Sequence, residues 1–305
     1  SATTIMVVSF VNAGLVTLGN AIGVIMGANI GTTLTAWITS LGFSVNIALF
    51  AVPMMGVGFV LHSSKKATMK NIGQFLMGFA VMYVGLTFMK DCSNEILGQY
   101  QTGMMNFFGS INGFGFWSIL LFLIAGAVLT IVLQASSATM AITMLLAASG
   151  LIDFRLAVAM VLGENIGTTI TANIAAAVAN TSAKRAARAH TIFNIIGVIW
   201  VLAIFGPIVK LICIIMTELG FQDPMAASAQ LAAIAKSGEA VDAAVMSNLK
   251  DSLLYGIAML HTLFNVTNTF LLIWFVPLIE KAVCWLVKEP KGETEVFSLK
   301  YISGG

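Results

Sequence analysis

Charged side chains are scarce in this chain of 305 residues. Asp, Glu, Lys and Arg make up 9% of it, against about 25% in a soluble domain, and the mean hydropathy is +0.95. Residues 1–64, 96–152 and 252–279 contain no charged side chain at all. Because a helix needs about 20 apolar residues to cross the hydrocarbon core, these stretches have the length of one or more spans. The composition excludes a single water-exposed globule and predicts an integral membrane protein.

Further absences exclude whole classes of function. The formal net charge of +2 provides no basic face, so nucleic acid is not expected as a partner. Cys92, Cys213 and Cys284 have no metal or disulfide spacing, and we expect no transition-metal site. Neither a nucleophile triad nor a carboxylate pair is apparent, which predicts that the protein is not an enzyme and has no catalytic residues. The chain begins at Ser1 without Met or a signal peptide, and we expect it to be a fragment.

An internal repeat organises the sequence. Residues 1–36 align without gaps to residues 137–172, with 14 identities in 36 positions. Gly27-Ala28-Asn29-Ile30-Gly31-Thr32-Thr33 corresponds to Gly163-Glu164-Asn165-Ile166-Gly167-Thr168-Thr169. The matches concentrate on Gly, Asn, Ser and Thr, whose polar members are costly in lipid. The same offset predicts a counterpart of Gln134-Ala135-Ser136 just before Ser1.

Each copy is expected to contain helices that stop partway across the membrane. Residues 137–149 would reach only about 20 Å before Gly150 ends them. Asp153 and Thr17 are suitable N-caps for the next two half-helices, 154–162 and 18–26. The glycine-rich motif that follows predicts an unwound stretch, which is tolerated at membrane depth only inside protein or beside a cavity.

Short loops predict the topology. The basic loops 63–71 and 181–189 and the C-terminal stretch are expected in the cytoplasm, whereas segments 91–112 and 217–251 are expected outside. The predicted elements are a broken helix 18–41, helices 45–62 and 72–90, a re-entrant hairpin 114–150, a broken helix 154–180, and helices 190–216 and 252–280. With these loop assignments the two copies cross the membrane in opposite directions.

The predicted fold is therefore an all-α integral membrane protein with two inverted-topology repeats, each a re-entrant hairpin, a broken transmembrane helix and two further helices. The first repeat spans residues 1–112 with a truncated hairpin, the second spans 113–285, and residues 286–305 form a cytoplasmic tail that leads to a missing domain. Inverted repeats with discontinuous helices are the architecture of secondary transporters. We expect a multi-pass protein of the plasma (cytoplasmic) membrane, the inner membrane of the cell. The sequence leaves open whether it forms a homo-oligomer.

The hairpin tip is the first candidate site. Gln134, Ser136, Ser137 and Thr139 surround the start of a half-helix whose free N–H groups favour an anion. Ser1 and Thr3 are the partial counterparts in the first copy. The competing interpretation is that these hydroxyls form hydrogen bonds between helices.

The twin motifs are the second candidate site. Their neutral oxygens suit an alkali cation, and the ligands expected are Asn29, Thr32, Thr33, Asn165, Thr168 and Thr169, with Thr35 and Thr171 less favoured. The alternative interpretation is that the motifs bind no ion and only permit close packing of helices. Glu164, which aligns with Ala28, could bind a cation or a proton, or pair at a cavity rim. The pattern His-Thr-x-Phe-Asn at 190–194 and 261–265 adds Asn265 as a further candidate outside the first-choice site.

Gln134-Ala135-Ser136-Ser137-Ala138-Thr139 and the twin Gly-x-Asn-Ile-Gly-Thr-Thr motifs resemble the type II sodium/phosphate cotransporter family in its bacterial form, often fused to a PhoU-like domain. The resemblance covers about residues 1–285 and implies that a Gln-Ser-Ser-Ser element in each repeat contributes to phosphate and sodium sites. It places Gln134 and Ser136 in both sites. Ala135 departs from the family pattern, and the first element is cut so that only Ser1 remains.

Charge balance explains why coupling is expected. Phosphate is largely divalent near neutral pH, yet Arg155 is the only basic side chain in the motif units, and a helix N-terminus supplies only about half a charge. Co-bound sodium would supply the remainder, which predicts sodium/phosphate symport, a secondary active uptake by alternating access with Na⁺ as coupling ion. The alternatives are a sodium-coupled carrier of another small anion or an amino acid, and a non-transporting ion-sensing membrane subunit.

Overall fold

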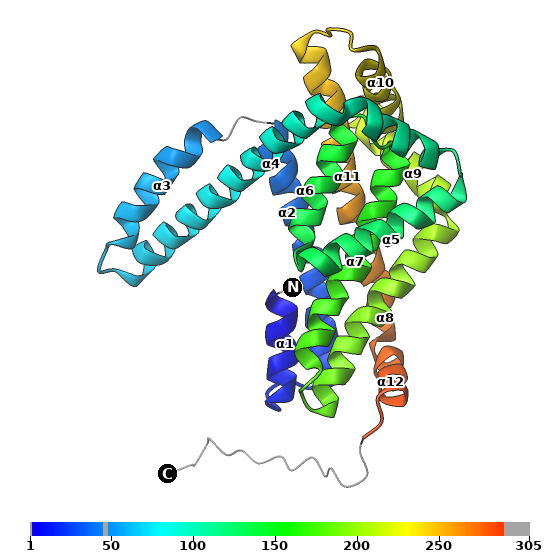
Figure 1. The fold of residues 1–305 in the computed structure, drawn as a ribbon. Helices are drawn as coiled ribbons and strands as arrows, with labels where there is room; N and C mark the ends of the chain where they lie inside the picture. Colours follow the sequence, from blue (N-terminus) through cyan, green and yellow to red (C-terminus); the bar gives the residue numbers. More distant parts are fainter. Residues whose placement is uncertain (1, 45–47, 290–305) are drawn as a thin grey trace, which may run out of the picture.

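The computed structural model describes residues 2–44 and 48–289, and these residues are almost entirely helical (Figure 1). The helices are α1 (Ala2–Asn12), α2 (Leu18–Ser44), α3 (Ala48–His62), α4 (Ala67–Asn112), α5 (Phe116–Leu133), α6 (Ser136–Ala148), α7 (Phe154–Ala176), α8 (Thr181–Ala203), α9 (Phe205–Glu218), α10 (Pro224–Ser237), α11 (Ala243–Leu272), the 3-10 turn η1 (Ile273–Phe275) and α12 (Val276–Leu286). The described part contains no strand, and the prediction of an all-α protein is confirmed.

Five helical segments are long and apolar enough to cross a membrane. They are Leu18–Ser44, Ala67–Ile96, Phe116–Leu133, Thr181–Ala203 and Ala243–Leu286. Many of their large apolar side chains are exposed on the outside of the bundle, as in Trp117, Phe270 and Trp274, which suits a lipid environment. The chain is therefore a multi-pass membrane protein.

Helix α7 forms the centre of the bundle. Sixteen of its 23 residues are buried, and helices α1, α5, α6, α8, α10 and α11 all pack against it. Asp153 caps it as predicted, because its Oδ1 accepts a hydrogen bond from the Leu156 N–H at 2.9 Å. Thr17 caps α2 in the same way, with its Oγ1 3.4 Å from the Asn20 nitrogen.

The predicted break at the hairpin tip is present. Helix α5 ends at Leu133, Gln134 adopts a left-handed conformation with φ of 53°, and α6 begins at Ser136. Gly150 then closes α6 with φ of 75°, where a side chain would collide with the backbone of Leu231. Thr130 Oγ1 and Thr139 Oγ1 join α5 to α6 at 3.0 Å.

The predicted unwound stretches are wrong, because α2 and α7 run as continuous helices through both glycine motifs. In α7 the glycines serve a different purpose: a Cβ on Gly163 or Gly167 would collide with the backbone of α5 at Leu123 or Ala127. Gly126 of α5 is in turn tight against the Met160 backbone. The motif therefore allows close approach of two helices, the use made of spaced small residues in membranes.

Other boundaries also differ from the prediction. Helix α4 continues through residues 97–112, which were expected as an external loop. The helix expected at 190–216 is divided at Ile204, and the one expected at 252–280 changes direction at η1. Each break lies within three residues of a proline, Pro207 or Pro277, which removes a backbone donor and clashes with the preceding turn. Helix α10 was not predicted, although Asp223 caps it and Gly238 closes it in the left-handed region.

Figure 1 shows the relative directions of the repeated elements. Helix α1 descends from the middle of the molecule, whereas α6 ascends from the middle; α2 then ascends and α7 descends. The hairpin of α3 and the first part of α4 projects away from this bundle as an arm.

Candidate polar site at the crossing of α2, α7, α8 and α11

The hairpin tip exposes some of its predicted side chains and buries others. Gln134 and Ser137 are exposed, Ser136 is half-buried and Thr139 is fully buried. Gln134 Nε2 donates to the Ile131 carbonyl at 2.6 Å, so that its amide oxygen stays free of that bond. Thr3 is exposed on α1, and Ser1 lies outside the described residues.

The twin motifs have matching hydrogen bonds on α2 and α7. Asn29 Nδ2 donates to the Ile25 carbonyl at 2.9 Å, and Asn165 Nδ2 donates to the Val161 carbonyl at 2.8 Å. Likewise Thr33 Oγ1 donates to Ile30 and Thr169 Oγ1 donates to Ile166, at 2.7 and 2.8 Å. Thr32 is half-buried and donates to the Ala28 carbonyl at 3.1 Å. Each asparagine thus has its amino group fixed to its own helix, which leaves the Oδ1 atom as the group it presents to a neighbour.

Helix α11 connects the two motifs. On one side, the Asn165 Oδ1 atom lies 3.4 Å from His261 Nε2 and 3.5 Å from Asn265 Nδ2. One turn further along, Thr269 Oγ1 donates to the Met26 carbonyl of α2 at 3.4 Å. Ser40 of α2 also donates to the Leu254 carbonyl of α11 at 3.0 Å. Helix α11 therefore contacts α7 at its motif and contacts α2 on either side of its motif, at Met26 and Ser40.

Helix α8 completes this polar region. Asn194 Nδ2 donates to the His190 carbonyl at 3.0 Å, the bond that Asn265 makes to His261 at 2.9 Å. Asn268 of α11 donates to the Phe193 carbonyl at 3.0 Å and accepts from Trp200 Nε1 at 3.1 Å. We call this region the central polar cluster; its members are Asn29, Glu164, Asn165, Thr168, His190, Asn194, His261, Asn265, Asn268 and Thr269.

The central polar cluster holds most of the unsatisfied polar atoms in the described part of the chain. Seven of the ten buried side-chain atoms without a hydrogen-bond partner belong to it. They are Glu164 Oε2, Thr168 Oγ1, both nitrogens of His190, Asn194 Oδ1, His261 Nδ1 and Asn265 Oδ1. Because buried polar atoms without partners are costly, their concentration on three helices that pack together, α7, α8 and α11, indicates a site for an ion, a polar ligand or water.

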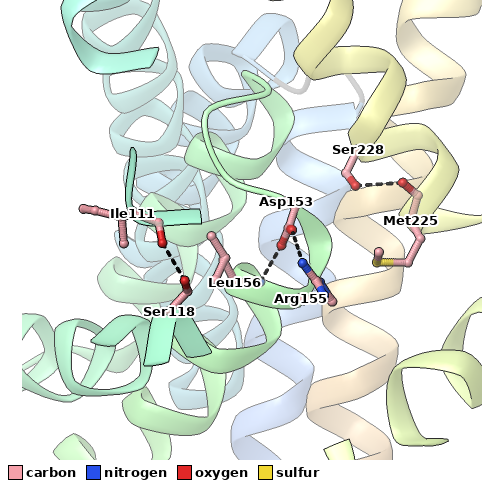
Figure 2. Close-up of polar contacts among 7 residues, drawn as sticks. All are labelled: Ile111, Ser118, Asp153, Arg155, Leu156, Met225 and Ser228. Carbon is pink, nitrogen blue, oxygen red and sulfur yellow. Dashed lines mark hydrogen bonds and ion pairs between the residues drawn. The ribbon is translucent and has the colours of Figure 1, made fainter. Parts of the chain in front are cut away.

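Basic side chains stay away from this region. Arg155 Nη2 pairs with Asp153 Oδ2 at 3.2 Å at the end of the bundle, and its side chain is 46% exposed (Figure 2). Figure 2 also shows Ser118 bonded to the Ile111 carbonyl and Ser228 bonded to the Met225 carbonyl at the same end. The other described ion pair joins Arg185 to Glu289 at 2.8 Å. Among the described residues, no group of three or more His, Cys, Asp or Glu could hold a metal ion.

Comparison with known families agrees with this geometry. The Na+/Pi-cotransporter family matches residues 1–91 and 118–222 of the chain, which include both motifs and the hairpin tip. The chain belongs to the Na+/Pi-cotransporter family.

Three relatives of this Na+/Pi-cotransporter family member were found among curated proteins. The uncharacterized protein YqeW of Bacillus subtilis (strain 168) is 31% identical over 202 residues, which are 66% of this chain and 62% of that protein. The putative inorganic phosphate export proteins YjbB of Salmonella typhimurium and Escherichia coli (strain K12) are each 30% identical, over 69% and 72% of this chain. The matched parts make up only 37% and 38% of those two proteins. No solved structure matches the chain.

The structure brings together only part of the predicted site. Asn165 of α7 and Asn265 of α11 are in contact, Glu164 and Thr168 are buried on α7, and Asn29 is buried on α2 close to Met26, which contacts α11. No described hydrogen bond joins Gln134, Ser136 or Ser137 to the cluster. Sequence reasoning left His190, Asn194, His261, Asn268 and Thr269 outside the site, although the repeated His-Thr-x-Phe-Asn pattern was a signal that pointed to the first three of them.

Proposed function

We propose that this Na+/Pi-cotransporter family member carries inorganic phosphate across the membrane by alternating access, coupled to sodium. The observation that carries the proposal is the matched bonding of Asn29 and Asn165: each fixes its amino group to its own helix, and the amide oxygen of Asn165 lies against α11. Neutral oxygens of this kind suit Na⁺, and repeated half-sites near the membrane centre are typical of secondary transporters.

Sodium is proposed to bind at Asn29, Thr32, Thr33, Asn165, Thr168 and Thr169, with Gln134 and Ser136 shared with phosphate. Phosphate is proposed to bind at the hairpin tip, at Gln134, Ser136, Ser137 and Thr139, with Thr3 and Ser1 from the first repeat. The placement of Arg155 in an ion pair at the bundle end supports the role of sodium as counter-charge, since that guanidinium is already paired.

The two copies are further proposed to be inverted repeats that extend over residues 1–112 and 113–285. The opposite directions of α1 and α6 and of α2 and α7 support this (Figure 1). The glycines of the two copies differ in their packing. No described heavy atom lies within 4 Å of a Cβ placed on Gly27 or Gly31, whereas Gly163 and Gly167 are covered by α5.

The test is transport of radiolabelled phosphate in proteoliposomes with a sodium gradient, against the same vesicles with choline. An inward sodium gradient should drive uptake, and an outward gradient should drive efflux from preloaded vesicles, the direction suggested by the names of the YjbB relatives. Equal flux in choline would contradict sodium coupling, and strong competition by sulfate would favour another anion as substrate.

Matched asparagine variants locate the cation. Asn165→Ala and Asn29→Ala should raise the sodium concentration for half-maximal transport by about tenfold or more, since an ion ligand is worth at least about 1.4 kcal/mol. Asn20→Ala, at an exposed position of the same helix as Asn29, is the control and should leave it unchanged.

A further inference from the structure

A pocket separate from the central polar cluster lies at the end of the bundle where α7 begins. Its volume is about 300 Å³, at the lower end of the range of about 300–1,000 Å³ for small-molecule sites. The last two turns of α4, the turn between α6 and α7, and one face of α10 enclose it. Met105 and Met225 supply apolar walls, while Asn112, Asp153 and Ser228 supply polar side chains. Apolar walls with a few polar groups suit an organic ligand.

The polar side chains of this pocket offer hydrogen-bond acceptors. Asn112 Oδ1 is buried and has no partner among the described residues. Ser228 donates its hydroxyl hydrogen to the Met225 carbonyl at 2.9 Å, so its oxygen can only accept a further bond. The Asp153 carboxylate is an acceptor on both of its oxygens. A complementary ligand must therefore donate hydrogen bonds, as a primary ammonium group does with its three N–H donors.

An acid and a base stand next to each other at the pocket. Asp153 lines it, and Asp153 Oδ2 accepts from Arg155 Nη2 at 3.2 Å (Figure 2). Asp153 would repel a free phosphate, and Arg155 would repel a simple cation. A molecule that carries both an ammonium and a phosphate group meets neither repulsion, because each of its charges has a partner of opposite sign.

The two charges also differ in depth. The Arg155 side chain is 46% exposed, whereas that of Asp153 is 19% exposed. A guanidinium has five N–H donors in a planar fork that suits phosphate, and the bond to Asp153 occupies one Nη group. The carboxylate is therefore placed to hold an ammonium within the pocket, while the guanidinium is placed to hold a phosphate at its mouth.

The pocket lies at the level where lipid headgroups are expected. The chain continues from Asn112 into α5, a helix long and apolar enough to cross a membrane. Phe114, Phe116 and Trp117 at this junction are all exposed, Trp117 by 73%. Aromatic side chains at the end of a span mark the boundary between hydrocarbon and water. A lipid with an ammonium and a phosphate in its headgroup can reach the pocket from this boundary.

We propose that this pocket binds the phosphoethanolamine group, as the headgroup of phosphatidylethanolamine. The ammonium donates to Asp153 and Asn112, the phosphate accepts from Arg155, and the two carbons between them lie against Met105 and Met225. This site does not depend on the proposed phosphate transport.

Calorimetric titration of the purified chain tests the headgroup. After detergent exchange to remove bound lipid, the protein is titrated with dihexanoyl phosphatidylethanolamine and with the matching phosphatidylcholine, whose trimethylated nitrogen has no N–H donor. Phosphatidylethanolamine should bind about tenfold tighter or more, since hydrogen bonds to charged groups are the strong ones. Equal affinities for the two lipids would overturn the proposal.

Two leucine variants on α4 locate the bound headgroup. Gly109 lines the pocket and Gly103 does not, yet a Cβ on either meets no described heavy atom within 4 Å. Gly109→Leu should fill the pocket and weaken phosphatidylethanolamine binding by about tenfold or more, whereas Gly103→Leu should leave it unchanged. Equal effects of the two variants would place the lipid elsewhere and refute the site. Thermal unfolding without added lipid checks that both variants fold.

Asp153→Asn tests the charge without removing the helix cap, because Asn is as good an N-cap as Asp. The ratio of phosphatidylethanolamine affinity to phosphatidylcholine affinity should fall towards one. A ratio that stays at the wild-type value would contradict the role of Asp153, since a merely structural change would weaken both lipids alike.

Soluble phosphoethanolamine distinguishes the source of the group. If the lipid is the ligand, the soluble compound should bind far more weakly than the dihexanoyl lipid. Equal binding of the two would support the pocket and overturn the lipid as its occupant. A protein that binds the lipid selectively but moves no phosphate would support this site and contradict only the proposed function.

Discussion

The contact between α5 and α7 makes a quantitative prediction about one glycine. Gly163→Ala places a methyl group against the backbone of Leu123, and backbone cannot turn aside as a flexible side chain can. Overpacking of this kind costs about 1–3 kcal/mol, and the upper end applies here. Alanine recovers up to about 1 kcal/mol through its better helix propensity. The expected net destabilisation is about 2 kcal/mol, or roughly 30-fold in the unfolding equilibrium.

The repeat supplies the matched control. Gly27 occupies the same motif position in α2, but a Cβ there meets no described heavy atom within 4 Å. Gly27→Ala should therefore leave this chain as stable as before or stabilise it by up to about 1 kcal/mol. Equilibrium unfolding in mixed SDS micelles, followed by circular dichroism, measures both variants. If the two alanines shift the unfolding midpoint equally and in the same direction, the close packing of α5 on α7 is not what the glycines serve.

Three further variants test other parts of the structure. Asp153→Ala removes the side-chain acceptor at the start of α7 and should cost about 1 kcal/mol of unfolding free energy. Thr17→Ala should cost less, because its hydrogen bond is exposed and 3.4 Å long. The same SDS titration compares the two variants, and equal losses would contradict an effect of burial. His261→Ala removes one donor from Asn165 Oδ1 and should change the sodium concentration for half-maximal transport while His62→Ala on the projecting arm does not. Pro207→Ala restores a backbone donor near Ile204 and should increase helicity between α8 and α9, seen as slower amide exchange at residues 204–206. Unchanged exchange would mean that packing sets the break.

The sequence predicted the elements whose signals are local. Asp153 and Thr17 are caps because Asp and Thr accept from the next turn, and the tip at Gln134 follows from the short helix after it, whose 13 residues cannot span the membrane. The buried asparagines were also recognisable, since a polar residue that recurs in an apolar stretch carries a cost that needs a reason.

What the sequence could not decide was the partner of each motif. Gly163 and Gly167 permit either an unwound helix or a close helix contact, and the nearby backbone of α5 determines that they serve contact. Helix α11 was underestimated for a similar reason. His261, Asn265 and Thr269 form one polar stripe, but only the fold shows that Asn165 and Met26 lie opposite its two ends. Helix α10 was missed because the acidic segment before α11 was interpreted as an external loop, although Asp223 and Gly238 were adequate helix signals.

The two motif copies agree in hydrogen bonding and differ in their neighbours, and this difference bears on the mechanism. Asn29 and Asn165, and Thr33 and Thr169, make the same bonds, so both copies can offer the same oxygens to sodium. Gly163 and Gly167 are tight against the backbone of α5, whereas no described heavy atom lies within 4 Å of a Cβ placed on Gly27 or Gly31. In an alternating cycle, related halves exchange their roles between the two sides of the membrane. Packing that encloses the motif of only one half therefore makes the two reorientations unequal, and Gly163→Ala should slow transport more than Gly27→Ala does.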